Sequence, residues 1–397
     1  MGHTMSKDSK LELASFLRGS VDLIEERELL SRIEAGEPLR VKFGMDPSSP
    51  DLHVGHAIPL LKLRDLQELG HQVVLIVGDS TAMVGDPSGK NQLRPQLTRE
   101  AVEANLLTYT EQAGKILDLD RTEVRRNSEW FDQMDFEGVL KLCARMTVAR
   151  MIERDTFQKR IKDSEPVGIH EFLYPLMQGW DSVQVSADVE LGGTDQLFNL
   201  LVGRQLQEQE GQRPQICVTT PLINGTDGRK MSKSYGNALL FEDSPSEVFG
   251  KTMSVEDEVM EVWYTQLTRV PEEEISEILA GHPRDAKVRL AKEMVELLHG
   301  SAEADQAAEA FDRQFRSKEL PDDIPEVAWP GESGLPLANL LRELGLAASG
   351  GEARRLVSQG GVRLDGEVAT EPMQVVEPPQ EELLIQVGKR RFARVRA

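Results

Sequence analysis

The stretch Asp51-Leu52-His53-Val54-Gly55-His56 separates two segments of different hydrophobic pattern. The segment before it, Val41–Pro47, is a short apolar run interrupted by glycine and proline, whereas Ala57–Leu69 has apolar residues at helical spacing and is followed by Gly70. The two histidines therefore lie where a strand gives way to a helix. Free backbone N–H groups and the positive end of the helix dipole favour a phosphate there. Two histidines at this place can also simply cap the helix or pack against it, so the motif alone does not decide.

Further along the chain, short apolar runs alternate with helical segments. Val73–Val77 is a continuous apolar run followed by Gly78 and Asp79, as in a buried parallel strand. Ile216–Thr220 is a second strand candidate and Val183–Val189 a weaker one. Helical periodicity occupies residues 11–35, 99–117, 136–160 and 170–181. This alternation predicts a doubly wound α/β domain with a Rossmann-like parallel sheet, in which ligands bind at the carboxyl ends of the strands.

The pattern changes again near residue 244. Residues 256–316 are helical and acidic, and residues 321–331 are rich in proline and acids, as in a linker. Two helices and two short strands follow, at residues 337–344, 352–359, 362–364 and 383–387. The sequence therefore predicts a catalytic α/β domain over residues 1–243, an α-helical domain over 244–320, a linker over 321–334 and a small α+β domain over 335–397.

Composition and charge restrict the class of protein. The chain has 397 residues, of which 39% are hydrophobic and 28% charged, and no apolar run is long enough to cross a bilayer. The N-terminus lacks the apolar core of a signal peptide, so we expect a cytoplasmic protein. A net charge of −21 argues against bulk electrostatic coating of nucleic acid. Residues 335–397, however, carry nine Lys/Arg and eight Asp/Glu, which suggests local contact with a polyanion.

A second motif, Lys230-Met231-Ser232-Lys233-Ser234, follows the glycine-containing segment 224–229. Two lysines three residues apart, set among hydroxyl groups, suit a clamp on a polyphosphate that gains negative charge. An exposed basic turn is the alternative. The pentapeptide and the earlier histidine motif together resemble the signature pair of class I aminoacyl-tRNA synthetases. No Gly-x-Gly-x-x-Gly string occurs, which argues against a dinucleotide site of the dehydrogenase kind.

Two further stretches carry polar groups suited to a small substrate. Tyr174, Gln178 and Asp181 are spaced so that they share one face of a helix. A structural hydrogen-bond network would account for them equally well. Gly192–Gln196 offers a tight turn with close backbone approach, and its carboxylate, Asp195, could accept bonds from two ribose hydroxyls.

Together these stretches resemble bacterial tyrosyl-tRNA synthetases, in the family's order and spacing. The resemblance implies activation of tyrosine with ATP, then transfer of the tyrosyl group to tRNA(Tyr). The resemblance implies that ATP is bound by Asp46, Ser48, His53, Gly55, His56, Gly193, Asp195, Lys230, Met231 and Lys233. Of these, His53, His56, Lys230 and Lys233, together with Lys90 and Arg94 of a basic loop, would carry the catalysis. It implies that tyrosine is bound by Lys42, Asp86, Tyr174, Gln178, Asp181 and Gln196.

Two positions depart from the better-known branch of that family. This chain has Lys42 where that branch has a tyrosine that helps to hold the substrate phenol, and a second branch with lysine there is closer. Asp181, with Lys42 nearby, is expected to bond the phenol hydroxyl. Pro59 lies in the first turns of the helix after His56, where proline is tolerated, so we expect that helix to be intact. Asn127 and Trp130 match an Asn-x-x-Trp string of the family, and no role is assigned to them.

The C-terminal segment resembles an S4-type RNA-binding domain over residues 352–366. Arg354 and Arg355 are expected on a helix, and a glycine-rich turn leads to Arg363. These three arginines suit recognition of the shape and backbone of structured RNA, with few base contacts. Arginines exposed only to solvent are the alternative.

The resemblance also has implications for substrates and for assembly, and two alternative functions remain. ATP would bind as a substrate together with Mg²⁺. We expect no tightly bound cofactor, no metal ion held by protein side chains and no association with a membrane. The family further implies a homodimer, formed through residues 130–165. Two other functions stay open: another nucleotidyltransferase with the same histidine motif, and a non-catalytic RNA-binding relative.

Overall fold

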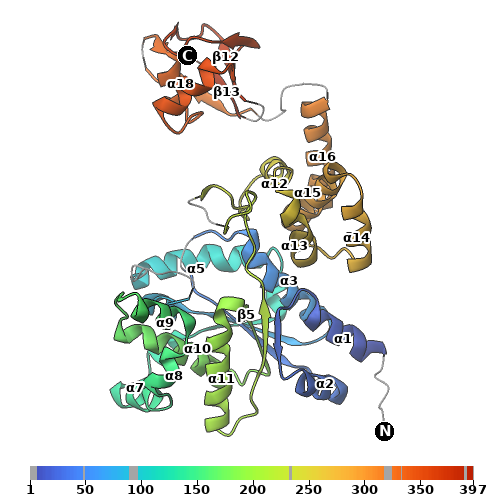
Figure 1. Ribbon diagram of the computed structural model, residues 1–397, viewed down its shortest axis with the longest axis vertical. Coiled ribbons are helices and arrows are strands. Elements are labelled where there is room, and N and C mark those ends of the chain that lie inside the picture. The colour runs from blue at the N-terminus through green and yellow to red at the C-terminus, as the bar shows by residue number, and fades with distance from the viewer. Residues whose placement is uncertain are drawn as a thin grey trace. The chain divides into compact units, whose positions relative to one another are not determined.

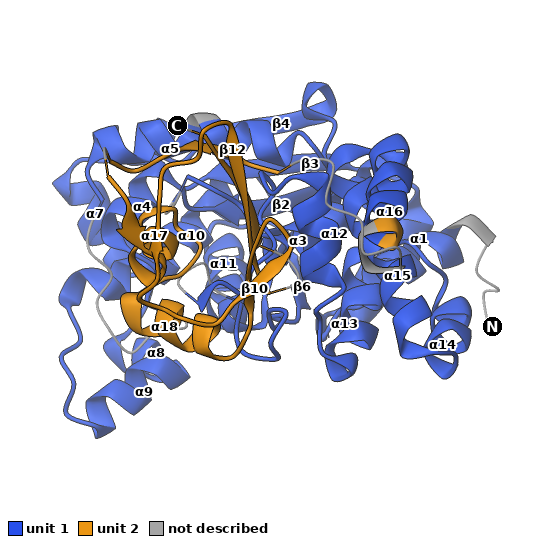
Figure 2. Cartoon of the chain, turned by 90° about the horizontal axis from the view of Figure 1, so that it is seen from above, with its two compact units in different colours: residues 1–311 blue, residues 312–397 orange. Residues whose placement is uncertain are grey.

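The computed structural model describes residues 7–47, 50–88, 97–231, 235–316, 324–331, 333–388 and 391–396. The chain forms two compact units, Met1–Phe311 and Asp312–Ala397, coloured separately in Figure 2. Within the described ranges, no helix combines the length and apolar character needed to cross a membrane.

Unit 1 is built on a six-stranded sheet of order β1-β6-β5-β2-β3-β4. The strands β2 to β6 pair in parallel, and only the edge strand β1 pairs antiparallel, with β6. Their bounds are β1 Asp22–Ile24, β2 Arg40–Met45, β3 Gln72–Val77, β4 Thr122–Arg126, β5 Val189–Gly193 and β6 Ile216–Thr220. The chain runs outward from β2 to β4 on one side and from β5 to β6 on the other, so the order reverses between β2 and β5. A ligand cleft is expected at the carboxyl ends of these two strands.

Helices cover both faces of this sheet, which confirms the doubly wound architecture (Figure 1). Alternate residues of β3 divide between the faces: Val73 and Leu75 join the core that contains α3 and α5, whereas Val74 and Ile76 pack against Trp130, Val185 and Ala187. The helices are α1 Lys7–Leu17, α2 Glu26–Ala35, α3 Val54–Glu68, α4 Asp79–Val84, α5 Arg99–Ala113, α6 Ser128–Phe131, α7 Phe136–Cys143, α8 Val148–Ile152, α9 Asp155–Lys162, α10 Leu173–Gln184 and α11 Leu197–Gln209. Three short 3-10 helices, at Leu119–Arg121, Ile169–Phe172 and Thr194–Gln196, complete this part of the chain.

The helix predicted after the histidine motif is intact. Pro59 is the sixth residue of α3, inside the helix rather than in its first turn. A proline there removes one backbone hydrogen bond. The helix nevertheless continues to Glu68, because its apolar residues are buried in the core: Leu60 and Leu63 are fully buried.

Three sequence predictions of secondary structure were wrong. The helical segment predicted over residues 136–160 is three helices, α7, α8 and α9. Residues 11–35 are not one helix, since the three-residue strand β1 lies between α1 and α2. That strand is too short to disturb the helical periodicity on either side. The strand predicted at Val183–Val189 is instead the end of α10 and a turn, and β5 begins only at Val189. The alternating apolar residues there pack the turn against the sheet, and Ser186 adopts a positive φ of 49°.

Five more helices follow, of which the last extends past the end of unit 1 at Phe311: α12 Pro245–Thr252, α13 Asp257–Leu267, α14 Glu272–Ala280, α15 Pro283–His299 and α16 Ser301–Arg316. One hydrophobic core joins them to the sheet domain, because Trp263 and Leu290 belong to the same cluster as Val41 and Leu60. The predicted helical character of residues 256–316 is confirmed, and the boundaries of the predicted domains stay a proposal.

Unit 2 is a small α+β domain, as predicted. Its five-stranded sheet has the order β10-β9-β12-β13-β7, and β8 pairs separately with β11. Leu337, Leu341, Val357 and Ile385 are buried in a core of its own. The elements are β7 Glu326–Ala328, β8 Leu335–Pro336, α17 Leu337–Glu343, α18 Gly350–Ser358, β9 Val362–Leu364, β10 Glu367–Ala369, β11 Val375–Val376, β12 Glu382–Val387 and β13 Arg391–Arg396.

Candidate active site

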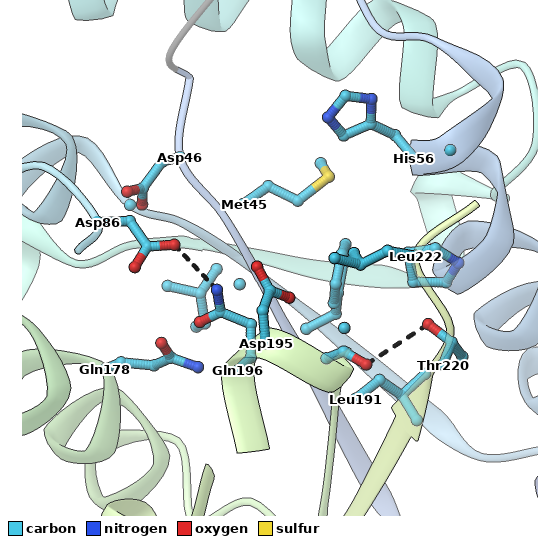
Figure 3. Close-up of a pocket in the computed structure, with 18 of the residues that line it drawn as sticks. Met45, Asp46, His56, Asp86, Gln178, Leu191, Asp195, Gln196, Thr220 and Leu222 are labelled. Atoms are coloured by element: carbon cyan, nitrogen blue, oxygen red, sulfur yellow. Dashed lines mark hydrogen bonds between the residues drawn. The ribbon is translucent and has the colours of Figure 1, made fainter. Parts of the chain in front are cut away.

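A cavity of about 330 Å³ lies at the carboxyl ends of β2 and β5, where the strand order reverses (Figure 3). It brings together most of the residues predicted from sequence, although they come from segments far apart in the chain. The predicted residues that line it are Asp46, His53, Gly55, His56, Asp86, Tyr174, Gln178, Asp181, Gly193, Asp195, Gln196, Lys230 and Met231. Of the other predicted residues of unit 1, Ser48, Lys90, Arg94 and Lys233 lie outside the described residues, and Lys42 is considered below.

The two histidines of the opening motif both cap α3 and line the cavity. Nδ1 of His53 accepts a hydrogen bond from the Gly55 amide at 3.1 Å, and the His53 amide donates to Nδ1 of His56 at 3.2 Å. The imidazole rings lie 4.1 Å apart. A Cβ on Gly55 would lie 2.8 Å from the His53 ring, which explains the glycine between them. Capping therefore fixes both imidazoles at a helix N-terminus, where a phosphate is favoured.

The turn after β5 brings Asp195 to the same cavity. A Cβ on Gly193 would lie 2.6 Å from Oδ1 of Asp195, so glycine lets the chain pass close to this carboxylate. Burial raises the pKa of Asp195 above its usual value, the nearby Asp86 raises it further, and Lys230 opposes both. Lys230 and Asp195 thus line one cavity and carry opposite charges.

Asp181 lies at the buried end of the cavity, on α10. The indole Nε1 of Trp130 donates to its Oδ1 at 2.9 Å, and Nδ2 of Asn127 lies 3.4 Å from its Oδ2. Burial raises the pKa of Asp181 to about 7, against the opposing effects of Lys42 and of the two hydrogen bonds. Asn127 and Trp130, which had no role assigned from sequence, thus position this carboxyl group.

Tyr174 and Asp46 form a second polar contact at the cavity wall. The Tyr174 hydroxyl donates to Oδ2 of Asp46 at 2.8 Å, and Oγ1 of Thr81 donates to Oδ1 at 2.8 Å. Burial raises the pKa of the Tyr174 hydroxyl well above its usual value, and Asp46 and Asp86 raise it further. The side chain of Tyr174 is therefore a neutral hydrogen-bond donor. The carboxylates around it favour a cation in the cavity.

Asp86 is held from two sides. Nε2 of Gln196 donates to its Oδ2 at 2.9 Å, as Figure 3 shows. On the other side, Nη2 of the buried Arg154 lies 3.7 Å from Oδ1 of Asp86 and also donates to Oγ of Ser88. No pattern in the sequence indicates Arg154, which is distant in the chain from Asp86 and follows α8 in a segment of ordinary composition.

Lys42 lies behind the cavity and does not line it. Its ammonium group is fully buried and donates to the carbonyl oxygen of Gln178 at 2.8 Å, to Oγ of Ser182 at 2.8 Å and to Oε1 of Glu190 at 2.9 Å. These three bonds use all three of its hydrogens. The structure therefore does not bring Lys42 to the place where a phenol would contact it.

Unit 2 presents the three predicted RNA-binding arginines at its surface. Arg354 and Arg355 are exposed on α18, whose opposite face buries Ala353 and Val357. Arg363 is exposed on β9 and donates to the carbonyl oxygen of Gly366 at 3.0 Å. All three guanidinium groups can reach a partner outside the chain.

Comparison with known proteins assigns both units. The family described as "tRNA synthetases class I (W and Y)" matches residues 34–316, and the S4 domain family matches residues 335–382. A tyrosine–tRNA ligase of Thermotoga maritima is 54% identical over 95% of each chain, and tyrosine–tRNA ligase 2 of Vibrio parahaemolyticus is 49% identical over 96% of this chain and 98% of its own. Among solved structures, the truncated mitochondrial tyrosyl-tRNA synthetase of Aspergillus nidulans has a TM-score of 0.64 and 26% identity, covering 77% of this chain and 94% of its own.

Proposed function

We propose, since the chain belongs to the tyrosyl-tRNA synthetases of class I, that the cavity of unit 1 is where it activates tyrosine. As a tyrosine–tRNA ligase, the protein joins tyrosine to tRNA, which rules out the two other functions that the sequence left open. The observation that carries the proposal is that one cavity is lined by His53, His56 and Lys230 together with Tyr174, Gln178 and Asp181. A phosphate-binding set and an amino-acid-binding set thus share one space.

Tyrosine would bind with its phenol toward the buried end of the cavity. Asp181, held by Trp130 and Asn127, would bond the phenol hydroxyl. The α-ammonium group would meet Asp86, Tyr174 and Gln178, with Gln196 fixing Asp86. Phenylalanine would leave the buried polar group of Asp181 without its partner, which is costly.

ATP would enter with Mg²⁺ at the end of the cavity formed by the α3 N-terminus. His53, His56 and the Gly55 backbone would contact phosphate oxygens, whereas Asp195, Gly193 and Asp46 would hold the ribose side. Lys230 and Met231 begin the lysine motif, and Ser48, Lys90, Arg94 and Lys233 would complete the nucleotide site from outside the described residues.

The chemistry needs no nucleophile from the protein. The tyrosine carboxylate attacks the α-phosphorus of ATP, the bond to the bridging oxygen breaks, and pyrophosphate leaves. Positioning the two substrates and stabilising the charge that develops on the phosphates supply the rate. The second step transfers the tyrosyl group to the 3′ end of tRNA(Tyr), which Arg354, Arg355 and Arg363 would help to bind.

A homodimer and a cytoplasmic location belong to the same proposal. Large apolar side chains are exposed along the segment predicted to form the dimer, and just beyond it: Phe136 is 76% exposed, Val148 65% and Ile169 85%. Exposed apolar side chains gathered on adjacent helices mark a protein interface. These side chains support a dimer formed through residues 130–165, which include α7 and α8.

The role of the histidines is tested by His56→Ala and Lys230→Ala. Each change removes a hydrogen-bond donor to the charge that develops in the transition state. The activation free energy of tyrosyl-adenylate formation should therefore rise by roughly 2.7–4 kcal/mol, and its rate should fall about 100- to 1,000-fold. Stopped-flow or quenched-flow activation assays measure this rate, and tyrosine affinity should change little.

His282→Ala is the matched control, because His282 also caps a helix through Nδ1, at 3.1 Å from the Arg284 amide, and does not line the cavity. It should leave the activation rate unchanged. An unaltered rate in both His56→Ala and Lys230→Ala would refute the assignment of the nucleotide site.

A further inference from the structure

Lys42 and Glu190 form a charged pair inside the sheet. They are register partners on the parallel strands β2 and β5, and both are 0% exposed. Nζ of Lys42 lies 2.9 Å from Oε1 of Glu190. Burying two charges costs several kcal/mol unless every remaining donor and acceptor finds a partner. The surroundings of the pair therefore indicate what it does.

Glu190 accepts hydrogen bonds from four groups. Besides Lys42, the donors are Nε2 of Gln178 at 3.0 Å, Oγ of Ser182 at 3.1 Å, and Nε2 of Gln215. An ionised carboxylate can only accept, so the Gln178 carboxamide must direct its nitrogen toward Glu190 and its oxygen away from it. Lys42 places its positive charge 2.9 Å from this buried carboxylate.

The orientation of Gln178 continues through a chain of carboxamides. Nδ2 of Asn199 donates to Oε1 of Gln178 at 2.8 Å and to Oε1 of Gln196 at 2.9 Å. Nε2 of Gln196 then donates to Asp86 at 2.9 Å. Figure 3 shows Gln178, Gln196 and Asp86 on the same side of the cavity. A carboxylate at each end thus fixes the direction of every amide between them.

Asn199 independently supports this direction of the carboxamide groups. Within the part of the chain that the structure describes, its buried Oδ1 has no hydrogen-bond partner. A buried acceptor without a partner is costly. Turning the Asn199 amide would move this deficiency to the two glutamine oxygens, whose direction is already set by Glu190 and Asp86.

We propose that Lys42 and Glu190 are a positioning pair for the amino-acid site. They hold the Gln178 carboxamide so that its oxygen, rather than its nitrogen, is presented to the α-ammonium group of tyrosine. Lys42 is therefore not a ligand of the phenol, which differs from the expectation drawn from its sequence position. The inference rests on the proposed role of Gln178 in binding the ammonium group.

Glu190→Gln tests the proposal with little change in volume. A neutral glutamine at position 190 can donate to Oε1 of Gln178, which lets the Gln178 amide turn and present its N–H donors to the ammonium group. The Michaelis constant for tyrosine in ATP–pyrophosphate exchange should rise roughly 10- to 100-fold, the range for a hydrogen bond to a charged group. The turnover number and the preference for tyrosine over phenylalanine should be unchanged.

Two inhibitors separate positioning from general damage. Tyramine keeps the ammonium group, and desaminotyrosine lacks it. In Glu190→Gln, inhibition by tyramine should weaken as much as tyrosine binding does, whereas inhibition by desaminotyrosine should not change. Equal weakening of both inhibitors would overturn the proposal, and so would a loss of preference for tyrosine over phenylalanine.

Further variants keep the test decisive if Glu190→Gln unfolds. The double change Lys42→Met with Glu190→Met replaces the pair by apolar side chains of similar size, which proteins often tolerate. It should show the same selective loss of ammonium-dependent binding, and wild-type binding of tyramine would refute the proposal. Glu171→Gln is the control, because it disrupts another buried pair, with Arg160, away from the carboxamide chain. It should leave the ratio of the two inhibition constants unchanged.

Gln178→Ala distinguishes failure of this inference from failure of the site assignment. If that change leaves the ratio of the tyramine inhibition constant to the desaminotyrosine inhibition constant unchanged, the proposed ammonium role of Gln178 fails and the inference fails with it. If Gln178→Ala raises this ratio but Glu190→Gln does not, the site assignment stands and only the positioning role of Lys42 and Glu190 is wrong.

Discussion

At the scale of single residues, the cavity assigns different tasks to similar side chains through their surroundings. Asp46 and Asp86 accept hydrogen bonds from Tyr174 and Gln196 at the cavity wall. Asp181 is instead buried, and this burial raises its pKa to about 7. The same carboxyl group can thus serve as an acceptor at one place and lie close to its protonation point at another.

The raised pKa of Asp181 predicts a pH dependence of stability. The unfolded chain loses this proton near pH 4, whereas the folded chain keeps it up to about pH 7. The stabilisation is therefore complete below pH 4 and is lost as pH rises toward 7, an effect on the order of 4 kcal/mol. In Asp181→Asn, the free energy of unfolding, measured with urea at several pH values, should lack this decline.

The exposed Asp163 provides the control for this measurement. Asp163→Asn should retain the wild-type slope of unfolding free energy against pH. Identical slopes in the wild type and in Asp181→Asn would show that Asp181 ionises normally in the folded protein.

Sequence reasoning found the residues whose relationship is local. Tyr174, Gln178 and Asp181 follow helical spacing, and the structure places all three along the cavity. Trp130 and Arg154 could not be predicted, because their partners Asp181 and Asp86 are dozens of residues away and only the fold brings them together.

The sequence contains a signal of the buried ion pair between Lys42 and Glu190. Lys42 and Glu190 are each a single charge between apolar residues of a buried strand. Such charges are almost never buried unpaired. Two of them in neighbouring strands therefore indicate an ion pair.

At the scale of elements, prediction succeeded where a segment is long and periodic. The helix after the histidine motif extends to Glu68 despite Pro59, and strands β2 to β6 pair in parallel as expected. Strands of three residues, such as β1, carry too little periodicity to be read. An alternating run such as Val183–Val189 can equally pack a turn, because alternation reports burial and not hydrogen bonding.

The helices α7 to α9 carry the prediction on assembly. Phe136 and Leu140 lie on α7 and are 76% and 54% exposed. If this surface forms the dimer, placing two charges there should give a monomer because unpaired charges at an apolar interface are costly. Phe136→Asp with Leu140→Asp should halve the mass measured by sedimentation equilibrium.

A matched variant on another helix checks that surface charge alone has no such effect. Val262 is 40% exposed on α13, and Val262→Asp should remain a dimer. A wild-type chain that sediments as a monomer at micromolar concentration would contradict the proposed interface.

At the scale of the whole molecule, the two units have separate hydrophobic cores and matches to two different families. The acidic body and the nearly neutral segment over residues 335–397 also differ in charge. The cavity lies entirely in unit 1, whereas the exposed arginines 354, 355 and 363 lie in unit 2. We therefore propose that activation of tyrosine and capture of tRNA are separable.

Truncation after Arg316 tests this separation. The shortened protein should retain tyrosine-dependent ATP–pyrophosphate exchange, since it keeps the cavity and its core. Charging of tRNA should fall by roughly tenfold or more, because phosphate contacts dominate affinity for nucleic acids. The full-length triple variant with Arg354, Arg355 and Arg363 changed to Ala should show the same pattern, and loss of exchange in that triple variant would contradict it.

We propose that the cavity of unit 1 selects tyrosine through Asp181 and activates it with ATP. ATP–pyrophosphate exchange with tyrosine and with phenylalanine, in the wild type and in Asp181→Asn, tests it most directly. The wild type should strongly prefer tyrosine, and Asp181→Asn should reduce that preference by roughly 5- to 150-fold, the equivalent of 1–3 kcal/mol for an unsatisfied buried group. An unchanged preference in Asp181→Asn would contradict the account.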